Sequence, residues 1–303
     1  MSGVMTEDRL ARLVKLGCGS GRDDEYQSWI RVRRKLSSPV SNIFSLPTPL
    51  HERPLQLLSG LEYKSADVAL WLSCVEAREQ HPLWPWEHVH PASGRHPQLD
   101  ARLPKVRGLL DIAREAGIDH GVYPGTCIPF VATIDFTLNV GPWHNSRLVH
   151  WSCKPRELLD SAPNRARMAE RIEMERLYSK EVGAMHVVVD GTQFPRILTA
   201  NLDWLRPLRS ELRETLHSSQ LHDYAAALMV YADSGTLYEA KARAAKVVGI
   251  ESALAENYFR AAAWLSLIDI DLTQPVVWSL PLRRDVSGTR HRMASALLGG
   301  LDA

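Results

Sequence analysis

Two strand-like runs, each carrying a charged residue, constrain this chain most. Residues 131–140, VATIDFTLNV, alternate apolar and polar side chains, as do residues 147–155, RLVHWSCKP. The turn between them, GPWHNS at 141–146, is typical of a hairpin that would pair the two runs. Because successive strand residues point to opposite faces, Asp135 and Lys154 are both expected on the polar face of the sheet. A carboxylate and an ammonium would then meet there.

A structural salt bridge would explain this pair, and the two strands alone favour that interpretation. A third charged residue, Glu62, supports a functional interpretation instead. It lies three residues after Ser59 in LLSGLE, the spacing of a capping box in which Ser59 caps a helix and Glu62 reaches back to its backbone N–H. A helix-borne glutamate, then a strand aspartate, then a lysine on the next strand is also similar to the order in nucleases of the restriction-endonuclease fold.

These residue types suit phosphodiester hydrolysis. Negative charge builds on the phosphoryl and leaving oxygens while water attacks the phosphorus. Hard cations held by carboxylates lower the pKa of bound water and neutralise that charge. A lysine beside the cation adds positive charge or orients the nucleophile. Glu62, Asp135 and Lys154 are therefore candidate catalytic residues.

The overall charge gives no general attraction to nucleic acid. Lys and Arg total 36 against 35 for Asp and Glu, so any DNA binding must come from local patches. Two basic segments are candidates, and a solvated surface is the simpler interpretation of each. They are RVRRKL at 31–36, with Arg31, Arg33, Arg34 and Lys35, and LRRDVSGTRHR at 282–292, with Arg283, Arg284, Arg290 and Arg292.

Cysteine and histidine spacing gives little support for a zinc site. The four cysteines lie far apart without a CxxC pair, which indicates reduced thiols rather than a disulfide scaffold. His88, His90 and His96 lie near one another, but prolines interrupt the segment, so a surface loop is favoured. The first residues contain acids and no apolar stretch, and no run approaches the ~20 apolar residues of a membrane span. We therefore expect a cytoplasmic protein with no membrane anchor.

The first ~190 residues alternate helices and strands, which indicates an α/β domain. The 303-residue length, with 45% hydrophobic residues, allows two domains, predicted at 1–194 and 195–303. Helices are predicted at 6–16, 55–75, 101–118 and 164–182, and further strands at 75–83 and 184–191, the last as a fully buried central strand. GCGSG at 17–21 is interpreted as a helix stop rather than a phosphate loop, because no strand precedes it and no GK[ST] follows.

The second domain is predicted to be mostly helical. Residues 237–281 read as a helix, a tight GIES turn, a second helix, and then LIDIDL at 267–272 as a wing strand with a partner at 276–280. This order predicts a winged helix-turn-helix. A generic helical bundle with an edge hairpin is the alternative.

Taken together, these segments resemble the TnsA family, the endonuclease subunit of heteromeric cut-and-paste transposases. The resemblance covers nearly the whole chain. It is carried by EYQSWIRV, LLSGLE, VEAREQHPL, TIDFTL, CKP, RIEMERLY, NLDWL and the helix-turn-helix, in that order. It implies an α/β catalytic domain of restriction-endonuclease type followed by a mainly α, winged-helix-like domain.

The resemblance also implies a site and a cofactor. Glu62, Asp135 and Lys154 match the family's acid, acid and lysine, and Mg²⁺, with Mn²⁺ as a substitute, would bind Glu62, Asp135 and the Cys153 carbonyl. One position departs from the pattern: Ser152 stands where typical members carry Gln, two residues before the lysine. Ser152 is a shorter and weaker candidate ligand. Glu175 matches an acidic position of the family helix and is a candidate additional acid.

The function implied is cleavage at the 5′ ends of a transposable element. A DDE-type transposase similar to TnsB would cut the 3′ ends. A AAA+ regulator similar to TnsC would contact the C-terminal domain, and transposon-end DNA would place the protein at the bacterial nucleoid. The alternatives are a stand-alone restriction or repair nuclease and a non-catalytic assembly scaffold. Ser152, as a weaker ligand, is the residue that supports the scaffold hypothesis.

Overall fold

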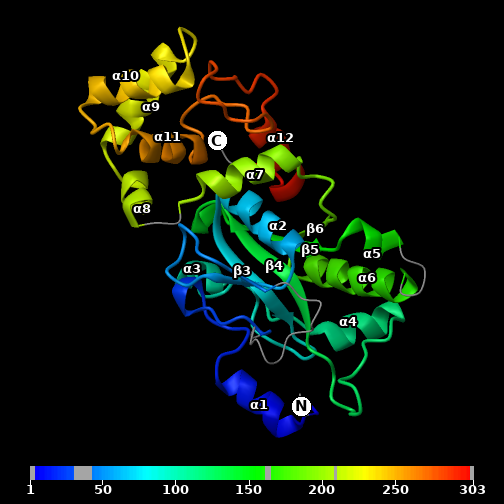
Figure 1. The fold of residues 1–303 in the computed structure, drawn as a ribbon. Coiled ribbons are helices and arrows are strands. Elements are labelled where there is room, and N and C mark those ends of the chain that lie inside the picture. Colours follow the sequence, from blue (N-terminus) through cyan, green and yellow to red (C-terminus); the bar gives the residue numbers. More distant parts are fainter. Residues whose placement is uncertain (1–3, 31–42, 161–164, 208–209, 301–303) are drawn as a thin grey trace. The chain divides into compact units, whose positions relative to one another are not determined.

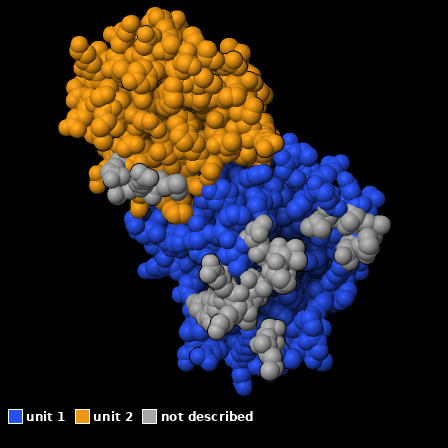
Figure 2. Space-filling model, in the orientation of Figure 1, with its two compact units in different colours: residues 1–46, 50–193, 297–303 blue, residues 47–49, 194–296 orange. Residues whose placement is uncertain are grey.

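The computed structural model describes residues 4–30, 43–160, 165–207 and 210–300. The basic cluster of Arg31, Arg33, Arg34 and Lys35 lies outside the described residues. The chain divides into two compact units, coloured in Figure 2. Unit 1 comprises Met1–Leu46, Leu50–Gln193 and Leu297–Ala303, and unit 2 comprises Pro47–Pro49 and Phe194–Ala296.

A four-stranded sheet in the order β3-β4-β5-β6 forms the centre of unit 1 (Figure 1). Strands β3 (Cys74–Leu83), β4 (Ala132–Val140) and β5 (Arg147–Cys153) pair antiparallel, and β6 (Met185–Val189) pairs parallel to β5. The predicted hairpin between β4 and β5 is confirmed, with the short helix η2 (Trp143–Asn145) in its turn.

The prediction that residues 184–191 form a buried central strand is wrong. β6 is the last strand in the sheet order, and only Val189 within it is buried. Its continuous apolar run is explained by α6 (Arg165–Glu181), which packs against β6 and β5. A run of valines can therefore mark an edge strand that a helix covers, as well as a central one.

Helices α2 (Gly60–Trp71) and α6 cover opposite faces of the sheet. The Ser65 hydroxyl of α2 contacts the Cys153 thiol of β5, whereas Glu175 of α6 accepts a hydrogen bond from Ser152. Because neighbouring strand residues point to opposite faces, these contacts place the two helices on either side. Helix α4 (Leu109–Ala116) packs against α6 and shares a buried apolar cluster with it and with the sheet. Unit 1 is thus a three-layer α/β/α domain.

The remaining elements of unit 1 correct two predicted helices. The helix expected over 55–75 begins only at Gly60, because Leu55–Leu57 forms β2, with both leucines fully buried, and pairs with β1 (Phe44–Leu46). The helix expected over 101–118 is confined to α4, since Pro104 and Gly108 break the pattern before it. The other elements are α1 (Glu7–Lys15), η1 (Asp23–Glu25), α3 (Pro97–Asp100) and α5 (Arg156–Asp160).

Unit 2 is helical. Its elements are α7 (Arg196–Leu205), α8 (Ser210–Leu216), α9 (Gln220–Tyr231), α10 (Leu237–Val248), α11 (Ala255–Trp264) and most of α12 (Thr289–Leu298). Helices α10 and α11 form the predicted helix pair, and Gly249 ends α10 in the left-handed conformation at φ +76°. The capping box of Thr236 and Glu239 starts α10.

The predicted wing strands at 267–272 and 276–280 are not present as strands. Instead, the carbonyls of Leu280 and Trp278 accept hydrogen bonds from the N–H groups of Leu237 (2.8 Å) and Tyr238 (2.9 Å). The first N–H groups of a helix lack an intrahelical partner, so this segment satisfies the start of α10 rather than a β-ladder. The observed unit is a helical assembly with an irregular connection where a wing was expected.

Gly108 and Gly117 provide a matched pair of glycines for a stability test. Both have positive φ, at +101° and +68°, but only Gly108 has no room for a side chain: a Cβ there would lie 2.5 Å from the Trp86 carbonyl carbon. We predict that Gly108→Ala lowers the free energy of unfolding by more than about 2 kcal/mol, because its conformation is nearly restricted to glycine and backbone blocks the methyl. Gly117→Ala should cost only about 1 kcal/mol. Urea unfolding midpoints would measure both, and equal costs would contradict the packing shown here.

Candidate active site

Asp135 lies where the pairing of β4 with β5 ends. The ladder runs from Val140↔Arg147 to Phe136↔Trp151, and two residues later the Cys153 N–H donates to Asp135 Oδ2 at 2.7 Å. Lys154 Nζ donates to the same oxygen at 2.6 Å. The predicted meeting of Asp135 with Lys154 is therefore confirmed. The pair is largely buried, with 12% and 13% of the two side chains exposed.

Lys154 keeps its charge despite this burial. Burial alone would lower the pKa of Lys154, but the negative charges of Asp135 and Glu175 outweigh it and raise the pKa above its usual value. The ammonium is thus protonated at any physiological pH. Asp135 Oδ1, the second oxygen, accepts no hydrogen bond from the described residues, so it is available to a further positive group.

Glu62 reaches the same place from the first turn of α2. Its N–H donates to the Ser59 hydroxyl at 3.1 Å, as the sequence predicted, but its carboxylate accepts the N–H of Leu58 (2.9 Å), one residue before the predicted partner. Glu62 is 5% exposed. Burial, and after it the charge of Asp135, raises the pKa of Glu62 from its ordinary value of 4.5 to about 7. The Asp135 carboxylate is therefore close enough to oppose the ionisation of Glu62.

Gln80 of β3 is a site residue that sequence reasoning did not single out. Its amide Nε2 donates to Glu62 Oε2 at 3.1 Å, and its Oε1 accepts from the Thr133 hydroxyl at 3.2 Å. Its backbone has φ +48°, which is unfavourable for a residue other than glycine. Strained backbone of this kind concentrates at functional sites. Apolar periodicity carries no signal for a positive φ, although Gln80 does lie within the REQ sequence that contributed to the family resemblance.

Ser152 connects the site to α6. Its hydroxyl donates to Glu175 Oε2, and His186 Nε2 lies 2.7 Å from the Ser152 hydroxyl oxygen. Because the single hydroxyl hydrogen is used by Glu175, His186 must donate to Ser152. Burial raises the pKa of Glu175, and burial together with the charge of Lys154 lowers the pKa of His186 to about 4. The structure thus brings Glu175 into electrostatic contact with Lys154, with a neutral histidine beside it.

The residues present fit a divalent cation that needs few protein ligands. No group of three or more His, Cys, Asp or Glu side chains suited to a metal occurs in the part of the chain that the structure describes. Zinc, which takes three or four such ligands, is therefore a poor match. Mg²⁺ is usually bound through one or two carboxylates, with water and phosphate oxygens filling its remaining positions. Glu62 and Asp135 are two carboxylates close enough for repulsion between them, and Asp135 Oδ1 is available. They meet that requirement.

The three clustered histidines do not converge. His96 stacks on Trp143 with ring centroids 3.6 Å apart, His88 Nε2 lies 2.7 Å from the Tyr178 hydroxyl, and His90 accepts the Ala92 N–H. The expectation of a plain surface loop is wrong in part, because His90 and Ala92 are buried. This loop folds back against β3 through the arginine contacts described below.

The basic segment near the C-terminus is partly neutralised. Arg284 pairs with Asp233 at 2.7 Å, Arg283 donates to Gln274, and Arg292 donates to Ser287. Arg290 is partly buried, which lowers its pKa. No described helix is long and apolar enough to cross a membrane.

Comparison with known proteins finds a similarity to one transposition protein. No protein-family model matches the sequence. The chain is 28% identical over 210 residues to the transposon Tn7 transposition protein TnsA of Escherichia coli. The aligned region covers 68% of this chain and 65% of that relative's own length. This similarity supports a distant TnsA-like relationship.

The raised pKa of Glu62 predicts a pH-dependent stability in metal-free buffer. Between about pH 4.5 and pH 7 the folded state holds a proton that the unfolded state has lost, so the free energy of unfolding falls as pH rises through this range. Glu62→Gln has no carboxyl group to titrate, so its free energy of unfolding should not fall in this way. We expect the variant to gain up to about 3 kcal/mol relative to wild type on going from pH 4 to pH 8. Urea unfolding with EDTA present would measure it, and a difference that is constant with pH would contradict the assigned environment.

Proposed function

We propose that this protein is a Mg²⁺-dependent DNA endonuclease that cleaves the 5′ ends of a transposable element. A partner DDE-type transposase similar to TnsB would cut the 3′ ends. The observation that carries the proposal is the convergence of Glu62, Asp135 and Lys154 at the end of the β4–β5 ladder. Similarity to a Tn7 transposition protein supports the biological setting.

In the proposed mechanism, Glu62, Asp135 and the Cys153 carbonyl would hold Mg²⁺, or Mn²⁺ in its place. The cation would supply an activated water and neutralise charge on the scissile phosphate. The Cys153 N–H and Lys154 fix one oxygen of Asp135 and would leave Oδ1 available to the cation. Leu58 and Gln80 fix Glu62 in the same way. Lys154, always protonated, can also donate to a phosphoryl oxygen as negative charge develops there.

We propose a supporting role for Glu175 rather than a direct contact with substrate. Its carboxylate helps to keep Lys154 charged, and the Ser152 hydroxyl orients it. Ser152 uses its hydrogen on Glu175 and one lone pair on His186, so only one lone pair is left for a cation. Ser152 is consequently a weaker candidate ligand than a glutamine at this position would be.

The partners are proposed on the similarity to TnsA. Transposon-end DNA is the substrate, and a AAA+ regulator similar to TnsC would contact the C-terminal unit, where α10 and α11 form a helix pair. The DNA substrate would place the protein at the nucleoid of a bacterial cytoplasm. Cutting DNA without any partner would instead favour a stand-alone restriction or repair nuclease.

A non-catalytic scaffold is the second candidate function. The observation favouring it is that Asp135 and Lys154 already form a buried ion pair. Ser152 also favours a scaffold, because it is a weak ligand for a cation. In that case the nuclease fold would only hold DNA and regulator together.

Strand-resolved cleavage of transposon-end DNA, with Mg²⁺ and the cognate transposase, tests the proposal. We expect Asp135→Asn and Lys154→Met each to reduce 5′-strand cleavage by at least about 100-fold, because the first removes a charged ligand of the cation and the second removes the ammonium beside the scissile phosphate. Lys105→Met is the control, since Lys105 forms an exposed ion pair with Glu87 and should leave cleavage unchanged. Full activity in either site variant would refute the nuclease assignment, and no cleavage by wild type in an assembled complex would favour the scaffold.

Gln80→Gly separates the role of the amide from the strain of the backbone. Glycine adopts positive φ without cost, so relief of the backbone strain should offset part of the cost of deleting this buried side chain, and the variant should still fold. Glu62 would nevertheless lose the Gln80 hydrogen bond, and we predict about a 10-fold loss of cleavage by protein that unfolds cooperatively. Unchanged cleavage would show that Gln80 does not position Glu62.

A further inference from the structure

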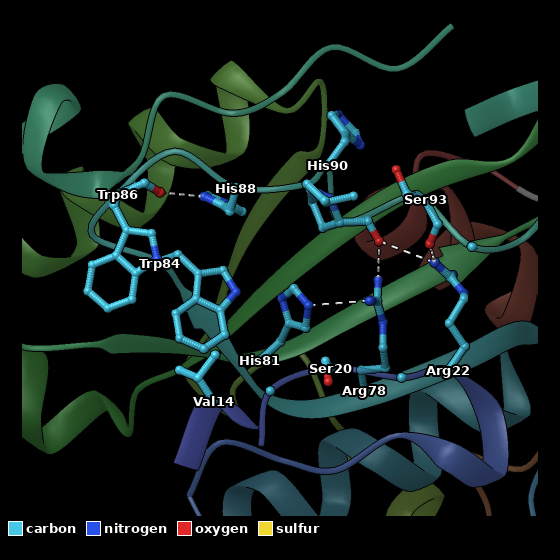
Figure 3. Close-up of a pocket in the computed structure, with 15 residues that line it drawn as sticks. Val14, Ser20, Arg22, Arg78, His81, Trp84, Trp86, His88, His90 and Ser93 are labelled. Carbon is cyan, nitrogen blue, oxygen red and sulfur yellow. Dashed lines mark hydrogen bonds between the residues drawn. The ribbon is translucent and has the colours of Figure 1, made fainter. Parts of the chain in front are cut away.

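Many arginines of unit 1 are committed to partners within the protein. Beside a pocket of about 560 Å³, Arg22 Nη1 donates to the Ser93 carbonyl and Arg78 Nη2 to the Pro91 carbonyl, both at 2.6 Å (Figure 3). These bonds hold the loop at 90–94 over β3. Other arginines of this unit form ion pairs with carboxylates, and these are Arg53, Arg107, Arg156, Arg167 and Arg176. Groups held in this way have little charge left for a ligand.

Arg171 of α6 differs from these arginines. It is exposed, and it forms no hydrogen bond or ion pair with any residue that the structure describes. The arginines before and after it on the same helix pair with Glu170 and Glu173. A guanidinium is always charged and carries five N–H donors in a planar fork. Arg171 therefore offers a complete cationic group to a ligand from outside the protein.

Helix α6 and strand β5 run in opposite directions with a regular register. The Ser179 hydroxyl of α6 lies 2.8 Å from His150 Nδ1 of β5, and one helical turn earlier Glu175 accepts a hydrogen bond from Ser152. Four residues of helix rise about 6 Å and two residues of strand about 6.6 Å. Each step of four residues back along α6 therefore matches a step of two residues forward along β5.

The next step in this series places Arg171 level with Lys154, the residue that directly follows β5. Arg171 and Glu175 share one side of α6 because they are four residues apart. Glu175 is buried over the strand, and Arg171 is exposed where the strand has ended. The electrostatics agree with this placement: burial raises the pKa of Glu175, and the charges of Lys154 and Arg171 both oppose that rise. Arg171 thus lies at the rim of the candidate active site.

We propose that Arg171 binds the DNA backbone at a phosphate beside the scissile one. This inference rests on the proposed function, since it takes the scissile phosphate to lie at Asp135 and Lys154. The chain as a whole is nearly neutral, so a phosphate backbone must be attracted by local cations. Lys154 is already paired with Asp135, whereas Arg171 has no carboxylate partner. Its planar fork also matches two oxygens of one phosphate.

Binding of a transposon-end duplex to the full-length protein, followed by fluorescence anisotropy in EDTA, tests this without cleavage. We expect Arg171→Gln to weaken binding roughly 3- to 10-fold and to lower the slope of log affinity against log salt concentration by about one, because one phosphate contact is lost. Arg171→Lys should keep most of the slope, because it keeps the charge. The thermal midpoint of each variant should match that of wild type, because the side chain is exposed and unpaired.

Arg176→Gln is the matched control. It removes the same charge from the same helix, but Arg176 is exposed, pairs with Glu173 and lies about 140° around the helix from Arg171. It should leave both affinity and salt slope unchanged.

Duplexes that each carry one neutral methylphosphonate near the cleavage position identify the phosphate. At one position the substitution should weaken binding by wild type but not weaken binding by Arg171→Gln any further, because the variant has already lost that contact. Arg176→Gln should respond to every duplex as wild type does.

The proposal is overturned if wild type does not bind the duplex, or if Arg171→Gln matches wild type in both affinity and salt slope. It is also overturned if Arg176→Gln weakens binding equally, or if no single methylphosphonate removes the difference between wild type and Arg171→Gln. Failure of the nuclease assignment gives a different result. In that case Asp135→Asn cleaves normally while Arg171→Gln still loses affinity, which leaves Arg171 as a DNA contact.

Discussion

The carboxylate of Asp135 at the end of the β4–β5 ladder is the interaction on which the candidate site depends. One of its oxygens takes the N–H of Cys153 and the ammonium of Lys154, so it holds the end of β5 and the lysine together. Lys154 in turn is kept protonated by Asp135 and Glu175 against the effect of burial. A buried ion pair is weak evidence for stability in general, because desolvation offsets its attraction. Its position at the end of a β-ladder, beside a second carboxylate, makes a functional role the better explanation.

The layered fold brings acids from both sides of the sheet to this point. Glu62 belongs to α2 on one face and Glu175 to α6 on the other, and both act electrostatically on Lys154. Within a regular sheet the strands themselves would separate two such groups. They can act on the same lysine only near the end of the strand pairing, where Lys154 directly follows β5. The proposed nuclease chemistry is in this sense a consequence of where two strands stop pairing.

Sequence patterns predicted which segments form helices and strands better than they predicted what packs against each one. Alternation identified β4 and β5. The spacing of Ser59 and Glu62 identified the cap of α2, although the apolar run before it wrongly extended the predicted helix back to residue 55. The same rules misplaced β6, because an apolar run does not reveal whether a strand or a helix covers it. They also predicted wing strands in 267–280, where carbonyl groups instead satisfy the first N–H groups of α10. Gln80 was missed because a positive φ leaves no trace in hydrophobic periodicity, and the Ser152–Glu175–His186 contacts because they join residues far apart in the sequence.

The central claim is that Glu62 and Asp135 together hold a divalent cation, and anomalous scattering from a crystal grown with Mn²⁺ would test it most directly. The account predicts a peak within coordination distance of both carboxylates, at Asp135 Oδ1, and its loss in Asp135→Asn crystals grown in the same way. A wild-type crystal in millimolar Mn²⁺ with no peak between these residues, and with Asp135 paired to Lys154 alone, would contradict the account and leave the pair as a structural salt bridge.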